Sequence, residues 1–381
     1  MNVVVAMVLV ASGAGYGYVR YQLSRLHRVS IPTLQTSGAG AGTGSSQGAT
    51  SHPAPPVGAF NVLLVGEDAQ GGGQRADTMI VARVDPGTGR AALLSIPYDY
   101  FAPIVGGGGP NKISDALAHG PADMVATVEQ DLGIRIQHYV QINFQGVASM
   151  VNALGGVRLR FPYPSRDSMS GLSVPRAGCV TLHGTQALAL VRSRFFSYYE
   201  GGYWQYDGSG AFGRIKRQQA FLRATVQRVK ASLLGNPLQL NRFVSTAVKD
   251  VTVDKGLGVG TLLQLAAAFR GLGSGTLATF TLPTQIVNND GQYGDVLYPV
   301  PSLDNATIAR WNASVIAPAV THPAGSKPGG PAAAGSLAPT TPSSAPKTTT
   351  RGGVVLPGPP QAPLGSIVQN RTSASYNPTP C

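Results

Sequence analysis

The sequence of 381 residues is poor in charge and in cysteine. Charged residues make up 12% of it, against roughly 25% in a typical soluble protein, which excludes a highly charged disordered protein and a solvated coiled coil. Two cysteines are too few for a disulfide-dense scaffold or a zinc finger. No histidine pair has metal-ligand spacing, no serine stands in Gly-x-Ser-x-Gly, and no glycine run leads into Gly-Lys-Ser/Thr. Zinc hydrolases, serine hydrolases and nucleotide P-loops are therefore unsupported.

Acidic residues are also scarce, with 17 Asp and Glu against 29 Lys and Arg and a formal net charge of +12. Both ends of the chain, residues 1–28 and 313–381, carry basic residues and no acidic ones. The stretch between them is consequently only mildly basic. That balance argues against a nucleic-acid-binding protein, whose Lys and Arg would form a dense stripe, and fits a site for one compact anionic group.

The beginning of the chain predicts a membrane anchor. Residues 2–19 are uncharged and open with an apolar run, long enough to cross a hydrocarbon core of about 30 Å. A cleaved signal peptide is the alternative, because the apolar run at residues 3–11 is short and small residues follow it. We expect residues 1–28 to be a single-pass anchor with its flank in the cell membrane, although the excess of arginine follows the span whereas a cytoplasmic flank should hold it.

Composition divides the rest of the chain into three parts. Residues 29–59 contain no Lys, Arg, Asp or Glu and include a run rich in Gly, Ala, Ser and Pro, which indicates a flexible linker. Residues 60–312 mix strand and helix patterns, so we expect a single α/β domain with a central mixed β-sheet covered by helices. Residues 313–381 are rich in Pro, Ala, Gly and Thr and have almost no large apolar residues, so we expect a disordered tail.

Hydrophobic periodicity predicts the elements of the α/β domain. A strand is expected at residues 61–65, followed by a hairpin with arms at 78–84 and 91–96 around the turn signal Asp85-Pro86-Gly87-Thr88-Gly89. Further strands are expected at 157–161 and 276–282, and helices at 122–132, 144–154, 184–191, 215–234 and 262–269.

Asp68, Arg75 and Asp77 form the first group of candidate site residues. Asp68 ends the first strand and the other two begin the next, where residues two apart in extended chain project to the same side. Two carboxylates beside an arginine suit a divalent metal bound to phosphate, Mg²⁺ or alternatively Mn²⁺. A surface ion pair that caps the hairpin is the competing interpretation.

The second group is basic. Arg192 and Arg194 share one face if the chain there is extended, while Arg214, Arg217 and Gln218 lie three and four residues apart on the first turn of the longest predicted helix. The positive potential of a helix N-terminus combined with several guanidinium groups suits a pyrophosphate. A basic solvated face explains the same residues.

Asp99 and Lys112 form a third and weaker group. A carboxylate at a strand end can act as a general base, and a nearby lysine can neutralise charge. The two cysteines, Cys179 and Cys381, either form a bridge outside the cytoplasm that ties down the chain end or leave Cys381 free or paired with another chain.

Taken in order, these segments resemble the LytR-CpsA-Psr (LCP) family of membrane-anchored bacterial wall enzymes. The resemblance extends from about residue 60 to 235 and covers many ordered points. Its most specific motifs are Asn61-Val-Leu-Leu-Val-Gly-Glu-Asp68, Arg75-Ala-Asp-Thr78, Ser95-Ile-Pro-Tyr-Asp99, Asn111-Lys-Ile113, Val191-Arg-Ser-Arg194 and Gly213-Arg214 to Gln218.

The resemblance implies an LCP-like fold and a Mg²⁺-dependent phosphotransferase on the extracellular side of the membrane. Such enzymes transfer a glycopolymer from a polyprenyl-pyrophosphate carrier to peptidoglycan, leaving a phosphodiester and releasing polyprenyl phosphate. The membrane, the lipid-linked glycopolymer and peptidoglycan would be its partners, and nucleic acid would not. The alternatives are a polyprenyl-pyrophosphate phosphatase and a non-catalytic binder of lipid-linked wall polymer.

The resemblance also implies roles for individual residues. Asp68 and Asp77 would hold the metal, and Asp99, Arg75, Arg192 and Arg194 would be catalytic, with Asp99 as the base. By motif position, Arg75, Arg192, Arg194, Arg214 and Gln218 would bind the pyrophosphate. To these we add Lys112 and Arg217 from the charge and helix spacing described above.

Two positions depart from the family pattern. Tyr98 stands where the family usually has arginine, and Ala211 stands where it often has aspartate, three residues before Arg214. Asp207 in the preceding loop is our candidate replacement for the missing carboxylate. The polyprenyl chain needs an apolar cleft, and we expect the helices at 122–132, 144–154 and 215–234 to line it, although ordinary core packing explains them equally well.

Overall fold

The computed structural model describes residues 21–22, 24–35, 58–68, 74–233, 237–258, 261, 277–316, 350–351, 354–355, 367–368 and 376–381. Within these ranges no helix has the length and hydropathy needed to cross a bilayer. The span expected at residues 2–19 and the helix expected at 262–269 lie outside the described residues.

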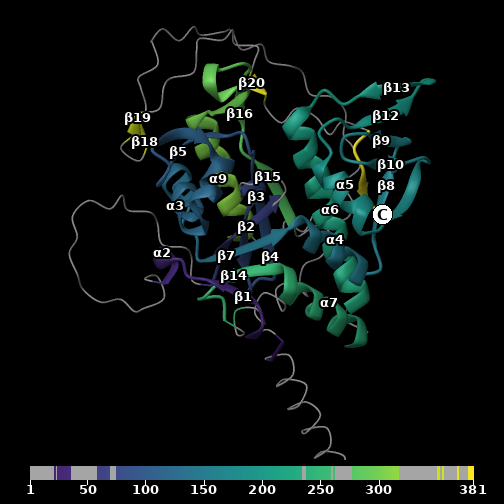
Figure 1. The fold of residues 1–381 in the computed structure, drawn as a ribbon, viewed down its shortest axis with the longest axis horizontal. Coiled ribbons are helices and arrows are strands. Elements are labelled where there is room, and N and C mark those ends of the chain that lie inside the picture. The colour runs from purple at the N-terminus through teal and green to yellow at the C-terminus, as the bar shows by residue number, and fades with distance from the viewer. Residues whose placement is uncertain are drawn as a thin grey trace, which may run out of the picture.

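A seven-stranded mixed sheet forms the centre of the protein (Figure 1), which confirms the expected fold class. β2 to β4 form an antiparallel meander, β7 lies parallel to β2, and β15 lies parallel to β4. The strand order across the sheet is β1 (His27–Val29), β14 (Val251–Asp254), β7 (His138–Asn143), β2 (Phe60–Asp68), β3 (Arg75–Asp85), β4 (Arg90–Ile96) and β15 (Leu277–Thr281).

Both faces of this sheet are apolar and covered. On one face, residues such as Leu63 and Val81 pack against η1 (Ile113–His119), α3 (Pro121–Leu132) and α9 (Pro301–Ile316), which contributes the fully buried Trp311. On the other face, strand residues including Val62, Ile80 and Leu93 contact Leu222 and Val226 of α6 (Gly210–Leu233). Since α3 and α6 lie on opposite faces, the expectation that these helices line one common cleft is wrong.

Local sequence signals set the ends of these elements. Asp85 accepts hydrogen bonds from the backbone N–H groups of Gly87 (2.9 Å) and Thr88 (3.3 Å), which closes the expected β3–β4 hairpin. The helix α3 begins at a proline and ends at Gly133, whose φ of 64° is readily reached only by glycine. The side chain of Asn143 caps α4 (Phe144–Ala153) by accepting from the Gly146 N–H at 2.7 Å.

Two smaller sheets and α5 enclose a second core. Leu159, Phe161, Leu190 and Phe196 are buried there together with Phe221 of α6. One sheet has the order β10 (Leu172–Val174), β9 (Ser165–Asp167), β12 (Ser197–Glu200) and β13 (Tyr203–Tyr206), the other has the order β11 (Gly178–Leu182), β8 (Val157–Phe161) and β21 (Thr379–Pro380), and α5 spans Gly184–Arg192.

Several further elements were not predicted, and the longest of them, at Pro237–Asp250, is an amphipathic helix whose periodicity was missed. Two of them, the hairpins β5–β6 and β16–β17, lie near the candidate site described below. The set comprises α2 (Pro32–Gln35), β5 (Phe101–Ile104), β6 (Gly109–Lys112), α7 (Pro237–Asp250), β16 (Thr284–Val287), η2 (Gly291–Tyr293), β17 (Val296–Pro299), β18 (Thr350–Arg351), β19 (Val354–Val355) and β20 (Ile367–Val368).

Both chain arms contribute to the fold, contrary to the expected boundaries. Residues 27–29 form β1 at the edge of the central sheet and Pro32–Gln35 form α2, so the expected start of the linker at residue 29 is wrong. At the other end, β21 pairs with β8, and Cys381 forms a disulfide with Cys179 across a Cα–Cα distance of 6.1 Å. Disorder throughout residues 313–381 is therefore wrong for the last six residues, because a covalent bond and strand pairing offset their ordering entropy.

Candidate active site

A cavity of about 580 Å³ opens where the β2–β3 hairpin, the segment after β4 and the start of α6 meet. Charged side chains from three distant parts of the sequence face it, and apolar residues of β16 and β17 close one side. Its lining includes Arg75, Asp77, Tyr98, Asp99, Lys112, Arg194, Phe195, Tyr206, Ala211, Phe212, Ile286, Val296 and Leu297.

Asp77 owes its place in the cavity to a β-bulge. Gly66 of β2 is opposite Thr78, and the next residue, Glu67, is opposite Ala76, so Asp77 is the extra residue on β3. A bulge re-aims the side chain at that point. The Asp77 carboxylate lies 3.1 Å from a guanidinium nitrogen of Arg194 and 3.6 Å from one of Arg214.

Asp68 makes the corresponding contact beside the cavity. It accepts a hydrogen bond from the Arg192 guanidinium at 2.8 Å, and the same guanidinium lies over the Phe144 ring, 4.8 Å from its centroid. Asp68 and Arg192 lie outside the lining of the cavity itself. The carboxylates of the first hairpin thus pair with arginines more than a hundred residues later, as the roles implied by the family resemblance require.

Tyr98 stacks against two site arginines. The guanidinium of Arg214 lies 4.1 Å from its ring centroid and that of Arg194 lies 4.5 Å away. Burial, with a contribution from the neighbouring Asp99 carboxylate, raises the pKa of Tyr98 to about 12, so its phenol is neutral at physiological pH. The residue that replaces the family's arginine therefore organises two arginines through its ring.

Asp99 and Lys112 form an ion pair inside the cavity. The Lys112 ammonium lies 3.4 Å from the Asp99 carboxylate, and both side chains are largely buried. Burial raises the pKa of Asp99, while hydrogen bonds from Tyr98 and Lys112 oppose that rise without cancelling it. A carboxylate with a raised pKa at the edge of an anion-binding pocket suits a general base.

Arg214, Arg75 and Gln218 occupy different surroundings. Arg214 is almost fully buried behind Tyr98, and burial together with the nearby Arg194 lowers its pKa. Arg75 lines the cavity, is well exposed and pairs with Asp115 at 3.1 Å. Gln218 lies outside the lining, where its amide donates to the hydroxyl of Thr78 (2.9 Å) and to the carbonyl of Val191 (3.0 Å), so it joins the hairpin to α5.

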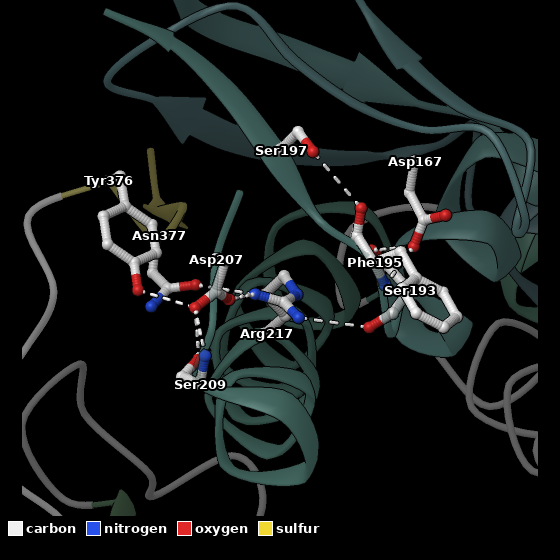
Figure 2. Close-up of polar contacts among 9 residues, drawn as sticks. All are labelled: Asp167, Ser193, Phe195, Ser197, Asp207, Ser209, Arg217, Tyr376 and Asn377. Carbon is white, nitrogen blue, oxygen red and sulfur yellow. Dashed lines mark hydrogen bonds and ion pairs between the residues drawn. The ribbon is translucent and has the colours of Figure 1, made fainter. Parts of the chain in front are cut away.

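The structure corrects the expected role of Arg217. Its side chain has no exposed surface, and its guanidinium donates to the Asp207 carboxylate (2.6 Å), the Ser193 carbonyl (3.1 Å) and the Asn377 side chain (3.2 Å), as Figure 2 shows. Helix periodicity placed it with the phosphate contacts, but α6 starts at Gly210 and turns Arg217 into the protein. Arg217 is a structural residue here.

The Asp207 side chain is also buried and does not line the cavity, whereas Ala211 does. Asp207 therefore cannot replace the carboxylate that is missing at position 211. Burial alone would raise the pKa of Asp207, but hydrogen bonds from Ser209, Tyr376 and Arg217 outweigh it and lower that pKa. The carboxylate is therefore charged at neutral pH and fully paired inside the protein.

A glycine makes room for this buried pair. A Cβ on Gly213 would come within 2.5 Å of the Asp207 carboxylate and 2.0 Å of the Ser209 hydroxyl. Gly213 precedes Arg214 in the motif that marks the start of the long helix. Its physical role is to let the Asp207 carboxylate approach the helix.

Sequence reasoning missed the residues that hold Ser193, which lies between Arg192 and Arg194. Its carbonyl accepts from Arg217, and its hydroxyl donates to Asp167 at 2.7 Å (Figure 2). Asp167 also accepts from the Phe195 N–H at 2.9 Å, and these hydrogen bonds lower its pKa despite burial, which would raise it. No spacing signal connects Asp167 to Ser193, and the strand that carries Asp167, Ser165–Asp167, contains only polar residues.

Asp68 and Asp77 provide the donor type that a divalent metal would need. Within the described part of the chain, no three His, Cys, Asp or Glu side chains gather as a metal cluster. Mg²⁺ usually takes one or two carboxylates and completes its coordination with phosphate oxygens and water. The two carboxylates keep 18% and 22% of their side-chain surface exposed, so their oxygens fit that requirement when a phosphate is bound beside them.

The fold and the pocket together define a class of α/β protein that presents arginines and carboxylates to an anion. The LytR_cpsA_psr family model matches residues 36–309, and the chain belongs to this family. A solved LytR-Csp2A-Psr enzyme from Actinomyces oris superposes with a TM-score of 0.58 at 25% identity, covering 76% of this chain and 96% of that chain. TagV from B. subtilis gives a TM-score of 0.55 at 25% identity, covering 68% and 97%.

Two curated relatives are similar in sequence to half or more of this chain. A probable cell wall biosynthesis protein, LcpB from Corynebacterium glutamicum, is 32% identical over 256 residues, which cover 65% of this chain and 57% of LcpB. The polyisoprenyl-teichoic acid–peptidoglycan teichoic acid transferase TagU from Enterococcus faecalis is 35% identical over 196 residues, 50% of this chain and 59% of TagU. The chain thus spans less than two thirds of the length of these relatives.

Tyr98→Ala is expected to weaken pyrophosphate binding by about tenfold, because it removes two cation–π contacts of about 0.5 to 1 kcal/mol each. Tyr98→Phe keeps the ring and should bind within about twofold of the parent protein. Calorimetric titration with geranyl pyrophosphate and Mg²⁺ measures both. Equal losses in the two variants would show that the phenol hydroxyl, rather than the ring, provides the contact.

Arg217→Ala should lower the free energy of unfolding by about 3 to 5 kcal/mol, because it leaves the Asp207 carboxylate buried without its partner. Arg194→Ala, at a side chain 47% exposed, should change stability by about 1 kcal/mol or less but weaken geranyl pyrophosphate binding. Urea unfolding and calorimetry separate the two effects. An Arg217→Ala variant that keeps its stability but no longer binds geranyl pyrophosphate would show that Arg217 contacts the phosphate instead.

Proposed function

We propose that this protein transfers a glycopolymer from a polyprenyl-pyrophosphate carrier to peptidoglycan through a phosphodiester bond during cell-wall assembly, as a Mg²⁺-dependent phosphotransferase. The observation that carries the proposal is that Asp77, Arg194, Asp99 and Lys112 line one cavity. Arg214 pairs with Asp77 from behind Tyr98. The name of the TagU relative, a polyisoprenyl-teichoic acid–peptidoglycan teichoic acid transferase, supports the same reaction class.

The reaction needs a charged phosphoryl group to be held while one P–O bond replaces another. The acceptor hydroxyl oxygen bonds to the phosphorus that carries the glycan, the bond to the bridging oxygen breaks, and polyprenyl phosphate leaves with the electron pair. Arg194, Lys112 and Arg75 are placed to bind the phosphate oxygens, with Arg192 beside them and Arg214 behind Tyr98. Phosphoryl transfer depends mainly on such positioning and electrostatic stabilisation.

The acceptor proton needs a base, and Asp99 is the carboxylate whose surroundings suit that task. Its raised pKa favours taking the proton as the hydroxyl attacks, and Lys112 stabilises its charged form before the reaction. Asp68 and Asp77 would hold Mg²⁺, which would neutralise charge on the pyrophosphate when bound.

The proposed site of action is the extracellular face of the cell membrane. A disulfide such as Cys179–Cys381 persists in an oxidising compartment, which supports a location outside the cytoplasm. The uncharged run at residues 2–19 would serve as the single-pass anchor. Because β1 begins at His27, the folded domain would then sit directly against the membrane surface.

Two departures from the family pattern favour a second candidate, a binder of lipid-linked polymer that performs no transfer. Tyr98 removes one arginine from the phosphate site, and Ala211 leaves that part of the cavity without a carboxylate. Hydrolysis of the carrier pyrophosphate is the third outcome that the same site could support.

Incubation of the purified protein with Mg²⁺, a polyprenyl-pyrophosphate-linked glycan and peptidoglycan should yield glycan attached to the wall polymer and polyprenyl phosphate. Asp77→Ala should reduce this yield by about a hundredfold or more, as expected for loss of one charge-stabilising group. Mass spectrometry of digested peptidoglycan measures the product. Free glycan phosphate with or without acceptor would indicate a phosphatase, and binding without turnover would indicate the non-catalytic binder.

The pH dependence of transfer tests whether Asp99 is the general base. Its carboxylate must be ionised to accept a proton, so kcat/KM should fall along an acidic limb as the pH drops through the pKa of Asp99. That pKa lies above the value of about 3.9 typical of aspartate. Lys112→Met removes a cation that lowers this pKa, so it should shift the acidic limb to higher pH. Asp99→Asn should abolish the limb and reduce the rate by about 10² to 10⁴. An unchanged limb in Asp99→Asn would exclude Asp99 as the base.

A further inference from the structure

One face of the four-stranded sheet carries aromatic side chains into solvent. In the β12–β13 hairpin, Tyr199 is opposite Trp204 and Ser197 is opposite Tyr206, so these side chains share one face. Ser197 is also opposite Arg166 of β9, which places that arginine on the same face. The other face, with residues such as Leu172 and Val174 of β10, packs on the second core.

The exposed aromatic residues of this outer face form ordered contacts with one another. Tyr199 and Trp204 meet edge to face with ring centroids 5.5 Å apart, and the Arg166 guanidinium lies 4.0 Å from the indole centroid. Tyr206 is 57% exposed and stacks with the 51% exposed Phe195. Large exposed apolar groups that touch one another mark an interaction surface more often than isolated ones do.

The face that carries Tyr199, Trp204, Tyr206 and Arg166, the aromatic face, is continuous with the cavity. Phe195 and Tyr206 line the cavity and also form the near edge of the aromatic face. A chain that lies along β12 and β13 therefore reaches the site of Asp99 and Arg194 without leaving the protein surface. This continuity ties the aromatic face to the chemistry of the cavity.

The chemistry of the aromatic face suits a sugar chain. A pyranose ring has a flat C–H surface and a polar edge, and Tyr and Trp match it with an apolar ring and a hydrogen-bonding group. Serine hydroxyls and one guanidinium accompany the rings on this face, and its strand residues include no Leu, Ile or Val. Surfaces that insert into lipid usually carry leucine beside their aromatic residues, and the strand residues of this face include none.

The position of the aromatic face also favours the wall side. In Figure 1, β1 lies low in the centre of the folded part and the β12–β13 hairpin lies at the upper right, away from it. Because β1 follows the proposed anchor, the β12–β13 hairpin would lie on the side of the protein away from the membrane, where the peptidoglycan acceptor would approach.

We infer that the outer face of the sheet formed by β9, β12 and β13, with Tyr199, Trp204 and Arg166 at its centre, binds the glycan strand of the peptidoglycan acceptor and guides its hydroxyl to the cavity. This inference rests on the proposed function for the identity of the acceptor. Binding to the face requires neither Mg²⁺ nor a lipid pyrophosphate.

The chain contains a built-in reporter for this surface. Its two tryptophans are Trp204 on the aromatic face and Trp311, which is fully buried in the central core. Titration with peptide-free glycan octasaccharides of alternating N-acetylglucosamine and N-acetylmuramic acid should therefore give a saturable change in tryptophan emission. Iodide quenching should decrease when the glycan is bound, because it shields Trp204.

Tyr199→Ala and Trp204→Ala should each raise the Kd for this octasaccharide by about tenfold, measured by calorimetry. The matched control is Tyr203→Ala. Tyr203 is 63% exposed and precedes Trp204 on β13, so its side chain lies on the other face of the sheet, where it pairs across the strands with Glu200. It should alter the Kd by less than about twofold. Thermal unfolding of all three variants verifies that they remain folded.

Three outcomes would overturn the inference: no octasaccharide binding by the parent protein, equal losses in Tyr203→Ala and Trp204→Ala, or a change in Trp204 emission with phosphatidylglycerol vesicles but not with the glycan. Because binding is measured without the lipid donor, it is independent of turnover. If the protein binds the octasaccharide through Trp204 but does not transfer glycan, the proposed function is refuted and the glycan-binding role of the aromatic face still stands.

Discussion

The arrangement of the site depends on the buried pair between Asp207 and Arg217. A buried ion pair gains little net stability, because both ions lose their hydration. This one instead fixes geometry: the guanidinium lies over the Phe196 ring, donates to the Ser193 carbonyl and contacts the C-terminal segment at Asn377. Tyr376 completes the arrangement by donating to Asp207 and stacking on Tyr198 with a centroid distance of 4.3 Å. The last residues of the chain thereby support the loop that carries the site arginines.

Ion pairs with carboxylates allow several basic side chains to lie close together at the candidate site. Arg192 pairs with Asp68, Arg194 and Arg214 share Asp77, and Lys112 pairs with Asp99. Under the proposed function, a pyrophosphate would replace the carboxylates as the partner of the arginines, and Asp68 and Asp77 would be free to hold Mg²⁺. Binding then exchanges ion pairs, which limits the cost of removing each charge from water.

Local and periodic signals predicted the main elements, whereas contacts between distant segments escaped prediction. The β2–β4 meander, α3 and α5 follow from apolar alternation, turn chemistry and glycine at helix ends. Asp77 and Arg194 fell into separate groups by their motifs, and only the family resemblance assigned both residues to one site, where they form an ion pair. Arg217 was misplaced because helical spacing fixes relative faces but not which face points inward. Nothing local in Tyr376 or Asn377 indicates a partner in α6 or in the loop that precedes it.

Tyr98 shows why a departure from a family motif is not simply a loss. An arginine at this position would add a third guanidinium beside Arg194 and Arg214, and mutual repulsion would have to be offset by an anion. The neutral Tyr98 ring instead attracts both cations before any ligand arrives. The site gives up one charged phosphate contact, worth about 1.5 to 3 kcal/mol, and gains preorganisation of two others. Affinity in this protein should therefore depend on the geometry of the Tyr98 ring as well as on the number of positive charges.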